Sequence, residues 1–240
     1  MLGAFSVVNG SFGTVGAHFS AALAECLAAK GKRVLLFELS PSCPTLDLLL
    51  GVSERVVYTL TDTERLSPEN VALTVRENLS FIPLGVGEVI SDTSFLEACV
   101  KALSPDVVLL STERSQLPLA RRISDGVLLV TDASQASLRA NAFLSSKESF
   151  DGFVLSDFVP TKEYAFKMLS LAEISDTLGL PLFGILPRID RADTPAAWGK
   201  DFLFAVRNMA GRLLGETVPL LCGIPIEGMR RRDFFARTSE

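Results

Sequence analysis

The stretch Ala4-Phe-Ser-Val-Val-Asn-Gly-Ser-Phe-Gly-Thr-Val-Gly-Ala-His18 decides the fold. Ala4–Val8 is an apolar run that predicts a buried strand, and Asn9–Gly16 is a glycine-rich loop. Apolar side chains then recur at helical spacing over His18–Lys30, and Gly31 stands where a glycine commonly ends a helix. A strand, a glycine loop and a helix in this order form the first unit of a doubly wound sheet, whose ligands bind at the carboxyl ends of the strands.

The same alternation continues along most of the chain. Six further strands are predicted at Arg33–Glu38, Leu79–Pro83, Asp106–Leu110, Gly126–Thr131, Gly152–Ser156 and Pro181–Leu186. Helices are predicted at Leu46–Leu50, Val56–Thr61, Ser94–Leu103, Leu117–Ile123, Gln135–Glu148, Tyr164–Leu178 and Asp201–Leu214. This pattern indicates an α/β fold with a doubly wound, mostly parallel sheet and helices on both faces. We expect one domain over residues 1–225 and a basic, aromatic tail at 226–240.

The amino-acid composition excludes several classes of function. The 240 residues are 48% hydrophobic and 21% charged, which excludes intrinsic disorder, and the net charge of −5 gives no domain-wide basic surface for nucleic acid. One histidine, His18, excludes a histidine triad or a His-rich metal site. The cysteines stand far apart without a CxxC pair and are predicted to be buried thiols in a reducing compartment: Cys26, Cys43, Cys99 and Cys222. No apolar run approaches the roughly 20 residues of a membrane span, so we expect a cytoplasmic protein.

The glycine loop supplies only part of a phosphate-binding site. Such a loop needs glycines that let backbone N–H groups surround a phosphate, a lysine for the β- and γ-phosphates, and a hydroxyl for Mg²⁺. Gly10, Gly13 and Gly16 supply the glycines, but no lysine precedes Lys30. The glycine spacing alone is therefore a weak signal.

Several segments in the same order resemble the MinD/ParA family of P-loop ATPases, from the first strand to about residue 200. Gly10–His18 is similar to the family's deviant Walker A sequence GKGGxGKTT, and Ala29–Ser40 is similar to its "KGK-V-L-L-I-D-x-D". Further similar segments are Thr45–Gly51 to "NLDLLLG", Arg76–Gly85 to "ENLxxLPxG", Asp106–Leu110 to the Walker B strand, Asp125–Thr131 to "ADxVLLVT" and Phe183–Pro187 to "xGxIPxD". The resemblance implies the family's P-loop fold.

The departures from the family fall on its chemical positions. The signature lysine position is Ser11, the Walker lysine position is Gly16, and the Mg²⁺-binding threonine position is Ala17. The acidic pair after the second strand becomes Glu38 and Ser40. The remaining positions carry Ser111 for the Walker B aspartate, Thr112-Glu113-Arg114 for the following "APP", and Ser156-Asp157 for the Asn-Arg that contacts adenine.

These replacements predict a catalytically inactive relative without a resident cofactor. Each lost charge-assisted hydrogen bond to the phosphates is worth about 1.5–3 kcal/mol, so losing two or three weakens ATP binding by roughly 3–6 decades. The vestigial loop positions are Gly10, Ser11, Gly13, Gly16 and Ala17. The former switch positions, which could form a standing interface, are Glu38, Ser40, Ser111, Glu113 and Arg114.

The resemblance then implies a scaffold or positioning factor for a bacterial envelope, pilus or flagellar-type machine. Its partners would be proteins, in a homodimer or a heterodimer with a MinD/ParA-like paralogue. The alternative is a sensor that binds ATP, ADP or another anion weakly through Gly10–Gly16, with a basic group such as Arg114 facing the loop. An enzyme with relocated catalytic residues is a third hypothesis, for which no cluster of residues argues.

Three remaining features favour ordinary structural roles. His18 is predicted to be a loop or cap residue. The charged group after the seventh strand is predicted to be a solvated loop: Arg188, Asp190, Arg191, Asp193 and Asp201. Arg230–Phe235 in the tail could contact the inner face of a membrane, but Asp233 interrupts its poor apolar stripe, so disorder or docking to a partner is preferred.

Overall fold

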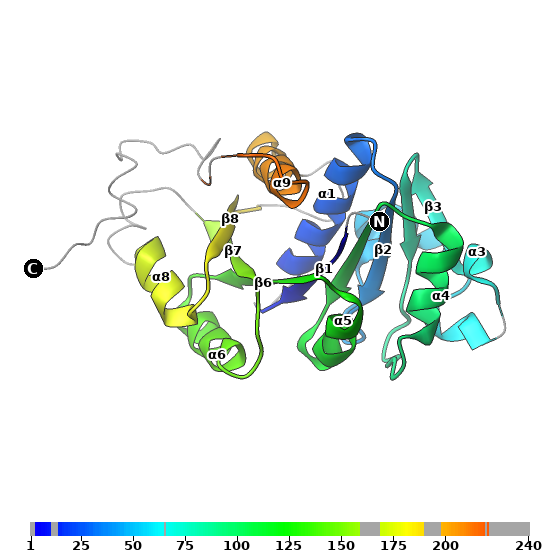
Figure 1. The fold of residues 1–240 in the computed structure, drawn as a ribbon, viewed down its shortest axis with the longest axis horizontal. Coiled ribbons are helices and arrows are strands. Elements are labelled where there is room, and N and C mark those ends of the chain that lie inside the picture. The colour runs from blue at the N-terminus through cyan, green and yellow to red at the C-terminus, as the bar shows by residue number, and fades with distance from the viewer. Residues whose placement is uncertain are drawn as a thin grey trace, which may run out of the picture.

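The computed structural model describes residues 3–10, 14–64, 66–158, 169–189, 198–218 and 220. Eight strands in these ranges form one sheet, in the order β3-β4-β2-β5-β1-β6-β7-β8. The strands are β1 (Gly3–Asn9), β2 (Val34–Leu39), β3 (Leu73–Arg76), β4 (Leu79–Ile82), β5 (Val107–Thr112), β6 (Gly126–Asp132), β7 (Gly152–Phe158) and β8 (Leu182–Pro187). All neighbours pair in parallel except β3 with β4, so the predicted doubly wound, mostly parallel sheet is confirmed (Figure 1).

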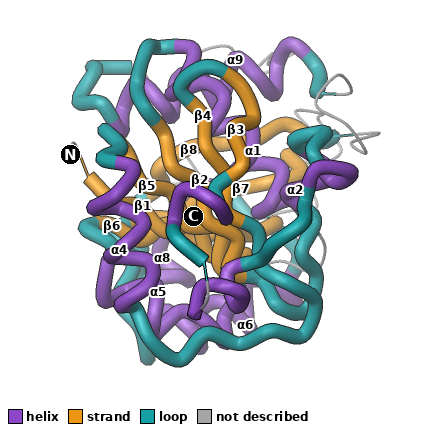
Figure 2. The backbone as a smooth tube through the Cα atoms, turned by 90° about the vertical axis from the view of Figure 1, so that its right-hand side faces the viewer, coloured by secondary structure: helices purple, strands orange, loops and turns teal. Residues whose placement is uncertain are grey.

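Helices cover both faces of this sheet, as Figures 1 and 2 show. They are α1 (Val15–Ala29), α2 (Leu46–Leu49), α3 (Pro68–Val71), α4 (Ser94–Leu103), α5 (Leu117–Ile123), α6 (Gln135–Ser145), α8 (Leu171–Leu178) and α9 (Lys200–Leu213). Short 3-10 helices are η1 (Ser53–Arg55), η2 (Leu60–Glu64) and η3 (Arg114–Gln116). No helix in the described ranges is long and apolar enough to cross a membrane.

The core lies in two layers on either side of the strands. On one face, α1 and α9 pack together on the sheet through buried side chains such as Phe19, Leu23 and Val206. On the other face, α4, α5, α6 and α8 cover the strands through residues such as Leu96 and Ile174. Strand β1 lies between β5 and β6, so the loop that follows it opens at the carboxyl edge of the sheet, where an α/β fold binds its ligands.

Two predicted helices differ most from the structure. Residues 56–59 are not helical, and the 3-10 helix η2 begins only at Leu60, whose N–H donates to the Pro83 carbonyl. Val57 and Tyr58 are exposed, so the predicted helix would have had no apolar face to bury. Helix α8 begins at Leu171 because a capping box at Ser170 fixes its start, and residues 164–168 of the predicted helix lie outside the described ranges.

One strand was missed, and the burial of two cysteines was predicted wrongly. Strand β3 was missed; it forms the antiparallel edge of the sheet and turns into β4 through Asn78, whose φ of 61° is left-handed. Cys43 is exposed and Cys26 is only half-buried, whereas Cys99 is buried as predicted. Burial raises the pKa of the Cys26 thiol to about 11 and that of Cys99 to about 12. Cys222 and residues 226–240 lie outside the described ranges.

Candidate functional site

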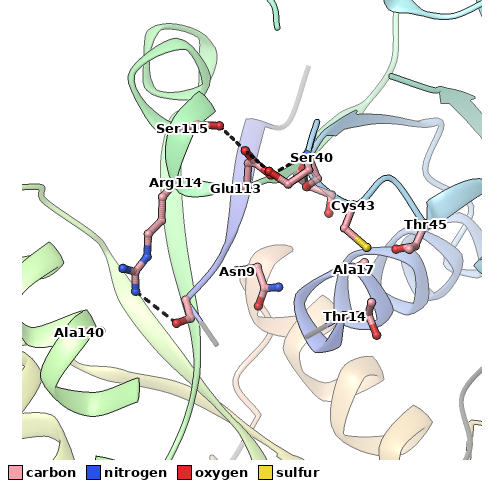
Figure 3. A pocket seen from close by; sticks show the side chains of 13 residues that line it. Asn9, Thr14, Ala17, Ser40, Cys43, Thr45, Glu113, Arg114, Ser115 and Ala140 are labelled. Atoms are coloured by element: carbon pink, nitrogen blue, oxygen red, sulfur yellow. Dashed lines mark hydrogen bonds between the residues drawn. The ribbon is translucent and has the colours of Figure 1, made fainter. Parts of the chain in front are cut away.

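A pocket of about 490 Å³ opens at the carboxyl ends of β1, β2 and β5 (Figure 3). Its walls come from the loop after β1, the beginning of α1, the segments after β2 and β5, and α6. The lining residues are Asn9, Gly10, Thr14, Ala17, Ser40, Ser42, Cys43, Thr45, Ser111, Glu113, Arg114, Ser115 and Ala140. The structure thus brings together predicted loop positions and predicted switch positions. Ser11 and Gly13 lie outside the described ranges.

The predicted lysine position has no room for a side chain. A Cβ atom at Gly16 would lie 2.8 Å from Cβ and 2.9 Å from Cγ of Asn9, closer than side-chain atoms approach each other. Gly16 is buried in the first turn of α1, and its carbonyl accepts a 2.8 Å hydrogen bond from Ser20 Oγ. Ala17, at the predicted hydroxyl position, contributes only a methyl group to the pocket wall.

Glu38 supports the backbone of the neighbouring segment. Its Oε1 accepts hydrogen bonds from the N–H groups of Thr45 (2.7 Å) and Leu46 (2.9 Å), which begin α2. The side chain is buried, and Oε2 has no hydrogen-bond partner among the described residues. Burial raises the pKa of this carboxyl to about 8, although the two N–H groups act in the opposite direction. Near neutral pH, Glu38 therefore favours its protonated form and caps α2.

Glu113 joins the two predicted switch segments (Figure 3). Its Oε2 accepts a 3.1 Å hydrogen bond from Ser42 N–H, and its Oε1 accepts from Ser42 Oγ at 3.2 Å. The Ser115 hydroxyl also donates to Oε1. Nearby, Ser40 Oγ donates to the Ser111 carbonyl at 3.5 Å. A carboxylate of the chain itself thus holds the segment after β2 against the segment after β5; we call these contacts the Glu113 clasp.

Arg114 faces the glycine loop from the opposite wall. Its Nη2 donates to Asn141 Oδ1 at 2.6 Å and to the Gly10 carbonyl at 3.3 Å. Asn141, fully buried on α6, also donates through Nδ2 to Gly10 O (3.1 Å) and Thr131 Oγ1 (2.8 Å). Asn141 therefore fixes both the loop and the guanidinium. Asn141 was not among the predicted site residues; its only signal in the sequence is a polar side chain on the sheet-facing side of a predicted helix.

Other sequence-predicted residues lie apart from the pocket lining. Ser156 is buried at the end of β7, and Asp157 has a left-handed φ of 55°. Burial and then Asp132 raise the pKa of Asp157, while Arg188 lowers it. Asp201 lies in the first turn of α9, and Asp190, Arg191 and Asp193 lie outside the described ranges.

His18 is not the predicted loop or cap residue. It is buried within α1, and its Nδ1 accepts a 3.2 Å hydrogen bond from Trp198 Nε1. This contact joins α1 to the segment that precedes α9. Within the described ranges, no three His, Cys, Asp or Glu side chains lie close enough together to hold a metal ion.

Comparisons with known proteins identify MinD proteins as similar in sequence. No family model matches the chain. The septum site-determining protein MinD of Thermotoga maritima is 26% identical over 253 residues, covering 91% of both chains. The MinD of Synechocystis is 24% identical over 247 residues, covering 90% of both, and that of Escherichia coli K12 is 23% identical over 250 residues with the same coverage.

Solved structures match the fold over most of the chain. MinD in a MinC:MinD cell division complex from Aquifex aeolicus superposes with a TM-score of 0.76 at 21% identity, covering 91% of this chain and 98% of that one. MinD from Pyrococcus horikoshii, complexed with Mg-ADP, gives 0.68 at 20% identity over 88% and 95%. A plasmid partition protein from Borrelia burgdorferi, bound to AMPPNP, gives 0.65 at 18% identity over 89% and 98%. The chain is thus similar in sequence to MinD proteins, and its fold is that of MinD and ParA-type proteins.

Proposed function

We propose that this chain has lost the nucleotide cycle of its relatives and acts through protein–protein contacts, as a scaffold or positioning factor for a bacterial envelope, pilus or flagellar-type machine. A homodimer, or a heterodimer with a MinD/ParA-like paralogue, is the expected assembly. The presence of MinC beside MinD in the Aquifex aeolicus complex supports a role for a protein partner.

The Glu113 clasp is the observation that carries the proposal. In nucleotide switches, γ-phosphate and Mg²⁺ hold the mobile segments, which are released on hydrolysis. Here the Glu113 carboxylate already binds Ser42 N–H and the hydroxyls of Ser42 and Ser115. The segments are therefore held together by groups that hydrolysis cannot remove. The surface that these two segments form would therefore be present with or without a bound nucleotide.

The pocket is also poorly suited to a magnesium-bound triphosphate. Its described lining carries one guanidinium, Arg114, and one carboxylate, Glu113, so the two charges offset each other. Gly16 excludes a side chain beside Asn9, and Ala17 has no hydroxyl for Mg²⁺. Phosphoryl transfer depends on positioning and on electrostatic stabilisation of the phosphate oxygens, and these residues supply little of either.

Hydrogen exchange at residues 40–46 tests the proposal directly. We expect the Ser42 amide to be protected equally without nucleotide, with Mg-ATP and with Mg-ADP, at millimolar concentrations. Glu113→Ala should remove that protection, because Ser42 N–H loses its acceptor. Ser115→Ala is the matched control, since it keeps both contacts to Ser42. Protection that rises only when Mg-ATP is added would refute a permanently held switch, as would micromolar binding of ATP in calorimetry.

A second candidate function rests on Arg114. Its guanidinium lies 3.3 Å from the Gly10 carbonyl, so it is placed beside the glycine loop as a sensor of small anions would require. Calorimetric titration with ATP and with inorganic phosphate tests this function. Binding that is present in the wild type and lost in Arg114→Gln would favour the sensor over the scaffold, whereas no heat with either ligand would exclude it.

A further inference from the structure

Four exposed apolar side chains gather on two loops beside the pocket. Val57 and Tyr58 are 73% and 41% exposed, and they precede η2. Val86 and Val89 are 81% and 66% exposed, and they follow β4. We call these four residues the loop patch. Exposed apolar side chains that lie on neighbouring loops can mark a site where another molecule binds.

Hydrogen bonds hold these two loops side by side. Glu88 lies between them: its Oε2 accepts from Thr59 Oγ1 at 3.0 Å and from Gly85 N–H at 2.7 Å. Leu60 N–H donates to the Pro83 carbonyl at 2.8 Å, which joins the same two loops. The four residues of the loop patch therefore lie on two loops that hydrogen bonds join to each other.

The surroundings of the loop patch are acidic. The described parts of the two segments, residues 53–62 and 83–93, carry four carboxylates: Glu54, Asp62, Glu88 and Asp92. They carry one arginine, Arg55, and its guanidinium donates to the Thr74 carbonyl on β3 at 2.7 Å. A ligand that combines apolar side chains with positive charge would suit this surface, although Arg122 already lies near one of the carboxylates, Asp92. An anionic lipid surface is the wrong charge for it.

The chain itself contains a segment of that chemistry. Residues 229–237 read Met-Arg-Arg-Arg-Asp-Phe-Phe-Ala-Arg, with four arginines against one aspartate and with two phenylalanines. We propose that this basic aromatic segment of a second copy of the chain docks on the loop patch. The phenylalanines would cover the valines, and the arginines would meet the surrounding carboxylates.

A second copy fits better than the same copy. Val218 and Glu216 lie at the amino edge of the sheet, where Glu216 pairs with Lys30 at 2.6 Å after α1 has returned from the pocket. The loop patch lies at the opposite, carboxyl edge. Two copies related by a two-fold axis would exchange their segments reciprocally and bury both patches. This contact does not depend on whether the pocket binds a nucleotide.

Sedimentation equilibrium of the full chain tests the proposal. We expect a concentration-dependent dimer that weakens with added salt and whose dissociation constant rises about tenfold or more in Val86→Ser/Val89→Ser. Arg230→Glu/Arg231→Glu/Arg232→Glu should have the same effect. Phe143→Ser, which alters an exposed apolar residue on α6, is the matched control and should leave the dimer unchanged.

A mixture of the valine variant and the arginine variant provides a second test of self-association. A chain with an altered patch still has an intact segment, and a chain with an altered segment still has an intact patch, so their mixture should form heterodimers more readily than either protein forms homodimers. A monomer at all concentrations would overturn the proposal. So would a dimer that survives the arginine substitutions, or arginine substitutions that abolish binding to anionic vesicles while leaving self-association intact.

Discussion

Replacement of Glu38 by glutamine should change how the stability of the protein depends on pH. The folded-state pKa of Glu38 is raised to about 8 by burial, whereas a glutamate in the unfolded chain titrates at about 4.3. Between these values, the folded protein keeps the proton and the unfolded chain releases it. The free energy of unfolding therefore falls as pH rises through this window, and the contribution of the neutral side chain is fully present only below about pH 4.3.

The size of the effect follows from the single proton that Glu38 keeps in the folded protein and releases in the unfolded chain. Each pH unit inside the window should lower the free energy of unfolding by about 1.4 kcal/mol, which amounts to about 3 kcal/mol between pH 5 and pH 7.5. Glutamine in Glu38→Gln keeps an oxygen that can accept from Thr45 and Leu46 N–H groups, and it cannot ionise. The variant should therefore lack this slope.

Urea unfolding of both proteins at half-unit steps from pH 5 to pH 7.5 measures the effect. The difference between wild type and variant isolates Glu38, because the other titrating groups, including Glu25 and Asp157 with their raised pKa values, are common to both. Glu54→Gln is the matched control, since Glu54 is exposed on η1. A difference between wild type and Glu38→Gln that stays constant over the range would refute the assignment of a buried, neutral Glu38.

Three further substitutions test the packing and capping of the fold by urea unfolding. Trp198→Phe removes the Nε1–H donor to His18 and should lower the free energy of unfolding by about 1–3 kcal/mol. Gly184→Ala places a Cβ 2.2 Å from Met209 Sδ and should cost about 1–3 kcal/mol, most of which disappears in the Met209→Ala background. Ser170→Ala breaks the capping box of α8 and should cost about 1 kcal/mol, with Ser170→Asp restoring it.

The parts of the fold that sequence predicted well depend on local periodicity. Helices α4 and α5 have the predicted bounds, because their buried positions recur at helical spacing between clear ends. The central strands were predictable for a similar reason: they are buried on both faces and read as continuous apolar runs. Strand β3 gave no such signal, since it is a four-residue edge strand that alternates half-buried and exposed positions.

The positions of the site residues could be predicted from the sequence, but the contacts between them could not. The loop and switch positions followed from the family resemblance, and the pocket does bring Gly10, Ala17, Ser40, Ser111, Glu113 and Arg114 together. Their contacts did not follow, because they join segments far apart in sequence. Glu113 and Ser42 are 71 residues apart, and Arg114 and Asn141 are 27 apart. Hydrophobic patterning also misled at Val57 and Tyr58, whose exposure depends on how two loops meet at the edge of the sheet.

The fold and the chemistry of the site depend largely on different residues of α1. The side chains that fix α1 on the sheet, such as Phe19, Leu23 and Leu27, are fully buried and are not among the residues that line the pocket. Ala17 lines the pocket from the first turn of the same helix, where it lies at the margin of this core. A high TM-score to nucleotide-bound relatives is therefore compatible with either chemistry. What separates the two is the behaviour of the Ser42 amide, because only a nucleotide-dependent switch would need ATP to protect it.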